Sequence, residues 1–246
     1  MRLGLIGGTA LGRLPLEEAR PLRVATRWGE PAAAPVAGRL RGVEVVFLNR
    51  HGDGHRLPPH RVPYRANVAA LRELAVSEVV AVNAVGAVDP SLPVGAWVVP
   101  EQIIDYTWGR DHSFFDGPPE PVVHVDFTDP YDGAVRRRLI EAAEAVGLPV
   151  VEGGVYGVTQ GPRLESAAEI RRLARDGCTL VGMTGMPEAA LAREAGLPYA
   201  CLALVVNPAA GLAGKPIREE EIGAVVTEAT PRLIELLGAY CRAVSP

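Results

Sequence analysis

The stretch that decides the fold is Gly177–Gly211, GCTLVGMTGMPEAALAREAGLPYACLALVVNPAAG. Its β-rich run Thr179–Val181 predicts a short strand, and the continuous apolar run Tyr199–Val206 is typical of a strand buried on both faces. Between them, the good helix formers of Ala189–Ala195 predict a helix that ends at Gly196. The order strand, helix, strand indicates an α/β fold.

Polar residues stand at the ends of both predicted strands. Thr184 follows the first strand, and Asn207 ends the second. Pro187 and Glu188 fit the first turn of the helix between them, where a missing amide is tolerated and a carboxylate is favoured. Because ligands of α/β sheets bind beyond the carboxyl ends of strands, Thr184 and Asn207 are the first candidate site residues.

Length and composition indicate one large domain. The chain has 246 residues, enough for a sizeable core, and 27 glycines and 22 prolines, which suit many sharp turns. No internal repeat, low-complexity segment or linker divides it. We therefore expect a single α/β domain over residues 1–246.

Charge and hydropathy argue against two classes of partner. The net charge is −4 without a basic run, which disfavours nucleic acid, and no apolar run reaches the roughly 18 residues of a membrane span. Met1 and Arg2 precede a strand pattern rather than a signal peptide. The three cysteines form no CxxC pair, which favours reduced thiols. These features predict a cytoplasmic protein.

A glycine turn, Gly7-Gly8-Thr9, follows the predicted strand Leu3–Ile6. Such a turn lets backbone amides approach an anion, and Thr9 adds a hydroxyl donor. The alternatives are a dinucleotide-binding turn or a plain loop. The GxGxxG pattern of an NAD site is not met, and no helix of normal length follows because Pro15 interrupts it, so NAD is disfavoured.

Two cationic or polar side chains follow the predicted strand Val43–Leu48. The fork of Arg50 suits phosphate, and His51 could add a second donor. Taken alone, Arg50 would more simply form a surface ion pair. His55 and His60 lie nearby without further ligands at metal-binding spacing, so we expect no metal site.

Two more predicted strands end in polar residues. Glu78–Val82 leads into Asn83 and Gly86, and Gly154–Val158 leads into a loop that carries Glu165. The alternative for Glu165 is a carboxylate without a site role, solvated in a first helical turn.

The other predicted elements are a hairpin over Val36–Leu48, a helix opened by Pro63, strands over Trp97–Val99 and Gln102–Tyr106, a long loop over 108–132, a helix over Val135–Val146, a helix capped by Ser166 and Glu169, and a final helix over Glu219–Val244 that Pro231 kinks.

Five motifs in order carry a resemblance that covers essentially the whole chain. They are Ile6-Gly7-Gly8-Thr9, Arg50-His51-Gly52, Val82-Asn83-Ala84-Val85-Gly86, Gln160-Gly161-Pro162-Arg163 and Gly182-Met183-Thr184-Gly185-Met186-Pro187-Glu188. The chain thereby resembles the trimeric purine nucleoside phosphorylase and methylthioadenosine phosphorylase family. The resemblance implies a twisted mixed sheet, partly closed into a barrel and flanked by helices, in a homotrimer with sites near the subunit interfaces.

The activity that the resemblance implies is phosphorolysis, in which inorganic phosphate attacks the anomeric carbon of a purine nucleoside. Phosphate is then a co-substrate, and no metal or organic cofactor is expected. The implied phosphate ligands are Thr9, Arg50, His51, Ala84 and Thr184. The implied nucleoside contacts are Met183 under the ribose, Leu164 against the purine, Glu165 and Asn207 at its edge, Asn83 and Gly86 beside them, and His124 from a neighbouring subunit. Asn83 stands where adenine-preferring relatives carry Thr. The implied catalytic residues are Asn207, Glu165, Arg50 and Thr184.

The choice of base follows from hydrogen-bonding groups. Glu165 can accept from N1–H of a 6-oxopurine, and the amide of Asn207 can donate at N7 or O6. Relatives that prefer adenine nucleosides carry Ser and Asp at these two positions. The sequence therefore predicts hypoxanthine or guanine as the base, because the wrong base would leave buried polar groups unpaired.

The prediction for the 5′ substituent of the nucleoside rests on the absence of a C-terminal His. General purine nucleoside phosphorylases place a C-terminal His on the 5′-hydroxyl, and no His follows His124 here. An apolar surface at Ile217 or a neighbour favours a 5′-methylthio group, so the expected substrate is S-methyl-5′-thioinosine. The alternatives are a general inosine and guanosine phosphorylase, then a methylthioadenosine phosphorylase. A non-catalytic nucleoside-binding protein is the last alternative, and it would not need a phosphate shell.

Overall fold

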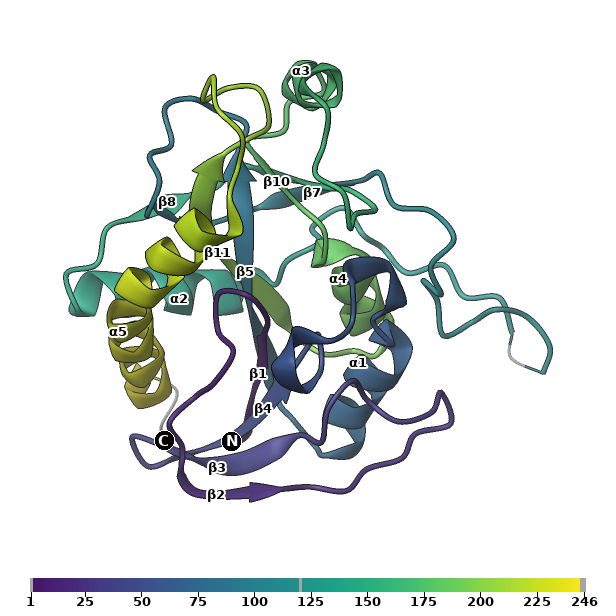
Figure 1. The fold of residues 1–246 in the computed structure, drawn as a ribbon. Helices are drawn as coiled ribbons and strands as arrows, with labels where there is room; N and C mark the ends of the chain where they lie inside the picture. Colours follow the sequence, from purple (N-terminus) through teal and green to yellow (C-terminus); the bar gives the residue numbers. More distant parts are fainter. Residues whose placement is uncertain (1, 120, 244–246) are drawn as a thin grey trace.

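An 11-stranded mixed sheet runs through the computed structural model, which describes residues 2–119 and 121–243, and helices cover both of its faces (Figure 1). The strands are β1 (Arg2–Gly7), β2 (Glu17–Pro21), β3 (Val36–Leu40), β4 (Val43–Asn49), β5 (Glu78–Ala87), β6 (Trp97–Val99), β7 (Gln102–Asp105), β8 (Val150–Glu152), β9 (Val155–Val158), β10 (Leu180–Gly182) and β11 (Tyr199–Pro208). The helices are α1 (Tyr64–Glu73), α2 (Gly133–Ala145), α3 (Ala167–Arg175), α4 (Gly185–Glu194) and α5 (Glu219–Ala243), with short 3-10 turns at Asp53–His55 and Pro59–Arg61. The predicted mixed sheet flanked by helices is confirmed.

Strand β5 is the centre of the sheet because it has neighbours on both edges. Its one edge pairs in parallel with β11 over nearly its whole length. Its other edge pairs first with β1, through residues 78–81, and then with β10, which runs antiparallel beside Gly86 and Ala87. On this second edge, residues 82–85 have no strand partner. We call this interruption the β5 gap.

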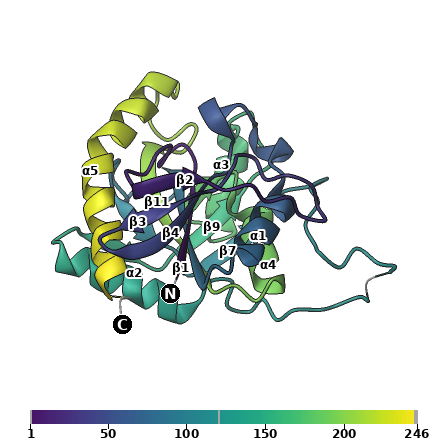
Figure 2. The same cartoon turned by 90° about the horizontal axis from the view of Figure 1, so that it is seen from below.

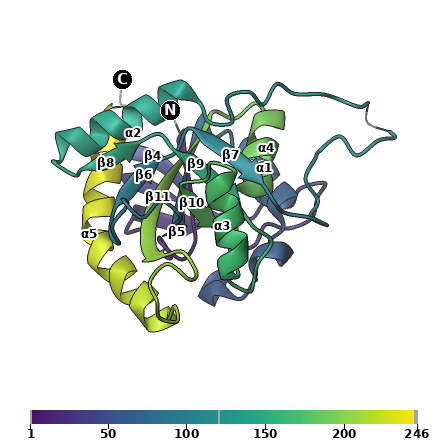
Figure 3. The ribbon, with the colours of Figure 1, turned by 90° about the horizontal axis from the view of Figure 1, so that it is seen from above.

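Side chains alternate between two cores along β5 and β11. Ala81, Val85 and Cys201 face α1 and α4, whereas Val80 and Leu202 face α2 and α5. Figures 2 and 3 show α2 and α5 together on one side of the sheet and α1 and α4 on the other. The prediction that Tyr199–Val206 is buried on both faces is confirmed.

The extent of β5 corrects one expectation. The strand does not end at Val82 but continues to Ala87, so Asn83 and Gly86 lie within it rather than beyond its end. The strand continues because β11 supplies a hydrogen-bonding partner along its length, with Asn83 opposite Ala203. A polar residue is tolerated in this buried strand because its side chain is hydrogen bonded on both sides, as described below.

Several boundaries also differ from the sequence prediction. Strands β2 and β8 were not predicted. The edge strand β2 is wholly exposed and has no alternation of apolar residues, and β8 has only three residues, too few to show such a pattern. Helix α2 begins two residues earlier than predicted because Asp132 accepts hydrogen bonds from the amides of Ala134 and Val135. The predicted capping box of Ser166 and Glu169 is present in α3.

The described part of the segment from 107 to 132 is anchored at its ends by the buried residues Arg110 and Tyr131, and between them it extends beyond α1 and α4 in all three views (Figures 1–3). It contains no helix or strand among its described residues. Trp108 and Val122 leave 72% and 71% of their area exposed. In the described ranges, no helix is both long and apolar enough for a bilayer crossing.

Candidate active site

The β5 gap exposes main-chain groups of residues 82–85. The amide of Val79 donates to the carbonyl of Pro198 on the β11 side, so odd-numbered residues of β5 direct their backbone groups to β11 and even-numbered ones to the other edge. Accordingly, the carbonyl of Val82 accepts a hydrogen bond from Nη1 of Arg50 at 3.3 Å. The amide of Ala84 points to the same edge. The geometry thus offers a main-chain donor where the sequence predicted a phosphate contact.

Arg50 reaches the gap from the end of β4, but most of its fork is already occupied. Its Nε and Nη2 donate to the two carboxylate oxygens of Glu188 at 2.7 and 2.9 Å. Burial disfavours the cation, and the Glu188 carboxylate outweighs that effect, so the pKa of Arg50 is raised. The ion pair is fully buried, not a surface pair, and only Nη1 of Arg50 faces the gap.

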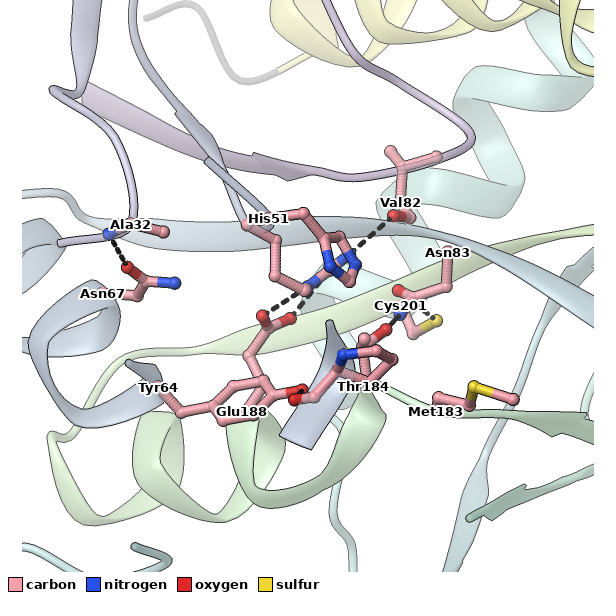
Figure 4. A network of polar contacts seen from close by, with 12 residues as sticks. Ala32, His51, Tyr64, Asn67, Val82, Asn83, Met183, Thr184, Glu188 and Cys201 are labelled. Carbon is pink, nitrogen blue, oxygen red and sulfur yellow. Dashed lines mark hydrogen bonds and ion pairs between the residues drawn. The ribbon is translucent and has the colours of Figure 1, made fainter. Parts of the chain in front are cut away.

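Glu188 is a residue whose role the sequence did not reveal. It was expected to be a first-turn carboxylate of α4, yet its side chain is 0% exposed. Besides Arg50, it accepts a hydrogen bond from the hydroxyl of Tyr199 at 2.8 Å. Figure 4 shows this carboxylate beneath His51 and β5. Glu188 therefore joins α4 to the end of β4 and to β11.

His51 corrects a second expectation, namely that its ring would be a donor to phosphate. Its Nδ1 lies 2.8 Å from the carbonyl of Leu57, which can only accept, so Nδ1 carries the hydrogen. Burial, and then the charge of Arg50, lower the pKa of His51 to about 4. The neutral ring consequently presents a lone pair at Nε2.

Gly8 allows these two side chains to meet the glycine turn after β1. A Cβ at Gly8 would lie 2.8 Å from Nη1 of Arg50 and 3.5 Å from Nε2 of His51. A Cβ would therefore force Nη1 of Arg50 to shift and would press tightly on Cδ2 of His51 at 3.2 Å. Arg50, His51 and the turn at Gly8 therefore surround one small space beside the β5 gap.

Three hydrogen-bonded polar side chains line the other side of the space beside the β5 gap. Asn83 donates from Nδ2 to Oγ1 of Thr184 at 2.8 Å, and the thiol of Cys201 lies 3.3 Å from Oδ1 of Asn83. All three side chains are buried. Thr184 is the N-cap residue of α4, but its hydroxyl caps no amide of that helix. Figure 4 shows the three residues in line and Met183 on the far side of Thr184 from Glu188.

Asn207 and Gly86 form the part of the site expected to meet the purine. Nδ2 of Asn207 donates to the carbonyl of Pro208 at 2.7 Å, which leaves its second amide hydrogen and Oδ1 unused by that contact. A Cβ at Gly86 would lie 3.2 Å from Nδ2. Gly86 therefore lets Asn207 lie directly against β5, at a bulge between Val205 and Asn207.

Glu165 lies in the loop after β9 and is half-buried. Its Oε1 accepts a hydrogen bond from the hydroxyl of Thr159 at 2.5 Å. A cleft of about 540 Å³ opens beside it, lined in part by Thr159, Gln160 and Trp108. Arg50, Thr184 and Asn207 do not line that cleft, so it lies beside the loop after β9 rather than over the β5 gap.

Three predicted site residues are not brought into contact with the others. Thr9 and His124 are exposed, and Leu164 leaves 46% of its area exposed. His124 belongs to the extended 107–132 segment. Their predicted roles remain predictions, as do those of Ala84, Met183 and the other site residues.

Arg110 is a further residue that the sequence analysis missed. Its guanidinium donates to the carbonyls of Thr159 and Gln160 and to those of Met183 and Met186, at 2.6–3.2 Å. It is 7% exposed, and none of these acceptors is a carboxylate. Arg110 thus ties the loop before Glu165 to the loop that carries Thr184. The aperiodic segment around it offered no pattern that could have indicated this.

Within the described part of the chain, no cluster of three or more His, Cys, Asp or Glu is arranged to hold a metal ion. Besides the lone pair of His51 Nε2 and the Val82 carbonyl, the groups around the β5 gap are donors, namely the Ala84 amide, the Thr184 hydroxyl and one guanidinium nitrogen of Arg50. Donors of this kind suit an oxyanion such as phosphate.

Sequence comparison places the chain in a family. Residues 2–242 match the phosphorylase superfamily. The chain belongs to this superfamily. It is 49% identical over 242 residues to a probable S-methyl-5′-thioinosine phosphorylase of Xanthomonas campestris pv. campestris, with 98% of this chain and 97% of the relative covered. It is 42% identical to the 6-oxopurine nucleoside phosphorylase of Pyrococcus furiosus, with 96% and 90% covered.

A solved structure supports the same relationship. Methylthioadenosine phosphorylase from Schistosoma mansoni in complex with adenine superimposes with a TM-score of 0.92 at 30% identity, covering 99% of this chain and 91% of that one. The predicted family and the predicted nucleoside phosphorylase fold are therefore confirmed.

Proposed function

We propose that this member of the phosphorylase superfamily cleaves S-methyl-5′-thioinosine with phosphate to give hypoxanthine and 5-methylthioribose 1-phosphate. The observation that carries the proposal is the set of donors at the β5 gap, where Nη1 of Arg50 reaches the Val82 carbonyl. Asn207 beside β5 and Glu165 after β9 each keep a hydrogen-bonding group that their contacts in the structure do not use. The name of the Xanthomonas relative, at 49% identity, supports the choice of nucleoside.

In the proposed arrangement, phosphate occupies the space between Gly8, Arg50 Nη1, the Ala84 amide and the Thr184 hydroxyl. Phosphate is a weak nucleophile, so fixed donors help chiefly by orienting it against the anomeric carbon. His51 Nε2 accepts the hydrogen of a hydrogen phosphate ion. The α4 N-terminus that follows Thr184 favours the negative charge.

Breaking the glycosidic bond gives an oxocarbenium-like ribose and an increasingly anionic purine. The second amide hydrogen of Asn207 is the group that stabilises this charge at N7. Glu165 accepts from N1–H of the 6-oxopurine through its remaining carboxylate oxygen. Met183 lies beside Thr184 and packs under the ribose.

A second candidate is a general 6-oxopurine nucleoside phosphorylase acting on inosine and guanosine. The Pyrococcus relative bears that name at 42% identity. This second candidate would recognise the base in the way proposed above and would differ from the first only in the pocket for the 5′ substituent. A methylthioadenosine phosphorylase, the activity of the Schistosoma relative, ranks third because Glu165 and Asn207 suit a 6-oxopurine.

One assay separates these candidates. S-methyl-5′-thioinosine, inosine, guanosine and S-methyl-5′-thioadenosine are incubated in parallel, with and without phosphate, and base release is followed. We expect phosphate-dependent cleavage of methylthioinosine to be fastest. Equal rates with inosine and guanosine would select the second candidate, and a preference for methylthioadenosine would refute the base assignment.

We also propose that the protein is a homotrimer in which the 107–132 segment reaches a neighbouring site. Its support is the exposed apolar area of Trp108 and Val122 and the extension of the segment from the body. His124, exposed in a single chain, would then complete the neighbour's nucleoside site.

A further inference from the structure

We propose that the buried thiol of Cys201 acts through Asn83 as a positioning group that turns the hydroxyl of Thr184 outward, as a donor to phosphate. The inference deepens the proposed function and rests on its placement of phosphate at Thr184. The observation behind it is one unbroken line of side chains: Cys201 Sγ to Asn83 Oδ1 at 3.3 Å, and Asn83 Nδ2 to Thr184 Oγ1 at 2.8 Å.

The fold brings these residues together although they are distant in sequence. Asn83 and Cys201 lie on the neighbouring central strands β5 and β11, and both project toward the face that α4 covers. Thr184 is 101 positions from Asn83 along the chain and reaches it from the start of α4. Their burial excludes water as a competing partner, because Asn83 and Cys201 are 2% and 1% exposed.

The direction of each hydrogen bond follows from the groups involved. Burial raises the pKa of the Cys201 thiol, so the sulfur keeps its hydrogen and can donate it. The amide oxygen of Asn83 only accepts, and its nitrogen only donates. With the oxygen toward sulfur, the nitrogen must face Thr184. Oγ1 of Thr184 is then the acceptor of that bond, and its own hydrogen stays available for another acceptor.

The reverse orientation would impair anion binding. If Asn83 were flipped, its oxygen would take the hydrogen of Thr184, and the hydroxyl would present lone pairs to an approaching phosphate. Such an arrangement repels the anion instead of binding it. A weak thiol donor therefore has a large effect here, because it decides which end of the amide meets Thr184.

Tyr156 is the one competitor for the Thr184 hydroxyl that must be tested. Its hydroxyl lies beside Thr184 and is buried. Among the residues the structure describes, that hydroxyl has no hydrogen-bond partner. If Thr184 donated to Tyr156, the hydroxyl would be unavailable to phosphate, whatever the state of Cys201.

The experiment compares Cys201→Ala, which removes the donor, with Cys201→Ser, which retains one. The Kd of inorganic phosphate is measured calorimetrically, together with kcat and the KM values of phosphate and nucleoside. We expect Cys201→Ala to raise the Kd and KM of phosphate about three- to tenfold, as for one lost hydrogen bond, with an unchanged nucleoside KM. Cys201→Ser should restore both values to within about twofold of the wild type.

Two control variants separate positioning from packing. Cys241→Ala removes another buried thiol, in α5 on the opposite face of the sheet, and should leave the phosphate constants unchanged. Tyr156→Phe should also leave them unchanged. An unchanged phosphate Kd in Cys201→Ala, a failure of Cys201→Ser to restore it, or a fall of the phosphate Kd in Tyr156→Phe would each overturn the inference.

A further variant replaces the amide nitrogen of Asn83, which donates to Thr184, with an oxygen that can only accept. Asn83→Asp is isosteric but places a carboxylate oxygen against Thr184, which then accepts the hydroxyl hydrogen. Phosphate binding should weaken about tenfold or more, since a bond to a charged ligand is lost and a negative charge is added. Wild-type protein that cleaves nucleoside without any need for phosphate would refute the proposed function. Wild-type phosphorolysis with indifferent Cys201 variants would refute this inference alone.

Discussion

Asn207 is held by its neighbour Pro208 in an orientation that leaves its second amide hydrogen unused by that contact. Because one hydrogen is already bound at 2.7 Å, the amide would not need to reorient in the proposed role of stabilising an anionic purine. Preorganisation of this kind is what makes a donor effective in the transition state.

Asn207→Ala should lower kcat by roughly 100-fold or more, the size of effect seen when one oxyanion-stabilising donor is removed. The phosphate KM should change little, since the proposed contact of Asn207 is with the purine and not with phosphate. Steady-state kinetics with methylthioinosine test this prediction. A kcat equal to that of the wild type would exclude Asn207 from the chemistry.

Base preference can be tested with a double variant, Asn207→Asp with Glu165→Ser. The pair replaces groups that suit N1–H and O6 with groups that suit a 6-aminopurine. The ratio of kcat/KM for methylthioadenosine over methylthioinosine should therefore rise. If that ratio is the same as in the wild type, the assignment of these residues to the base edge is wrong.

The lowered pKa of His51 predicts that the folded protein loses stability in acid. Its pKa is about 4 in the folded chain and about 6.5 when unfolded, so between these values the unfolded state binds a proton that the folded state does not. Unfolding free energy should thus fall as the pH drops from 6.5 toward 4, by on the order of 3 kcal/mol from this group.

His51→Gln retains a donor for Leu57 and removes the titration, so its unfolding free energy should depend less on pH over that window. Urea unfolding at several pH values measures the slope. The exposed His124→Gln variant is the control and should keep the wild-type slope. Identical slopes in all three proteins would mean that folding does not lower the pKa of His51.

At the scale of elements, the buried pair Arg50–Glu188 connects the end of β4 to α4. A lone charge left in such a place is costly, whereas the intact pair is compensated. Glu188→Gln preserves shape but leaves Arg50 unpaired, so we expect a loss of about 3–5 kcal/mol in unfolding free energy.

Glu221→Gln provides the matched comparison, because Glu221 pairs with Lys215 at 2.9 Å on the surface of the molecule. That change should alter stability by less than about 0.5 kcal/mol. Chemical denaturation of both variants gives the two values. Equal losses would show that burial of the Arg50 pair is unimportant.

Arg110 joins two loops that carry different parts of the site. Arg110→Lys keeps the charge but cannot reach the four carbonyls at once, so the loops of Glu165 and Thr184 should move independently. We expect the nucleoside KM to rise and kcat to fall together. A variant with wild-type kinetics would limit Arg110 to a role in folding.

The sequence predicted those features that depend on local pattern. The strand–helix–strand of Gly177–Gly211, the cap at Ser166 and the glycine turn at Gly8 follow from residues close together in the chain. The Arg50–Glu188 pair could not be predicted in that way, because its members are 138 positions apart and each has an ordinary local role. The extension of β5 past Asn83 likewise depends on its pairing with β11.

At the scale of the whole molecule, the 107–132 segment is buried at Arg110 and Tyr131 but leaves the large side chains of Trp108 and Val122 exposed in a single chain. If it packs against a second copy, the solution mass should be three times that of the chain. Val122→Asp places a charge on this apolar surface and should shift the mass toward that of one chain. Light scattering coupled to size-exclusion chromatography measures it, and a wild-type monomer would refute the trimer.

The β5 gap has a consequence for how this enzyme can change its substrate. The amide of Ala84 belongs to the backbone of a central strand, so substitution by any residue other than proline leaves that donor in place. The groups proposed for the base and the 5′ end are side chains, with Glu165 and Ile217 in loops and Asn207 near the end of β11. If the proposed roles hold, laboratory evolution can explore new nucleosides at positions such as Glu165 and Ile217 while the backbone donor proposed for phosphate is inherited unchanged, which makes this scaffold a suitable starting point for specificity redesign.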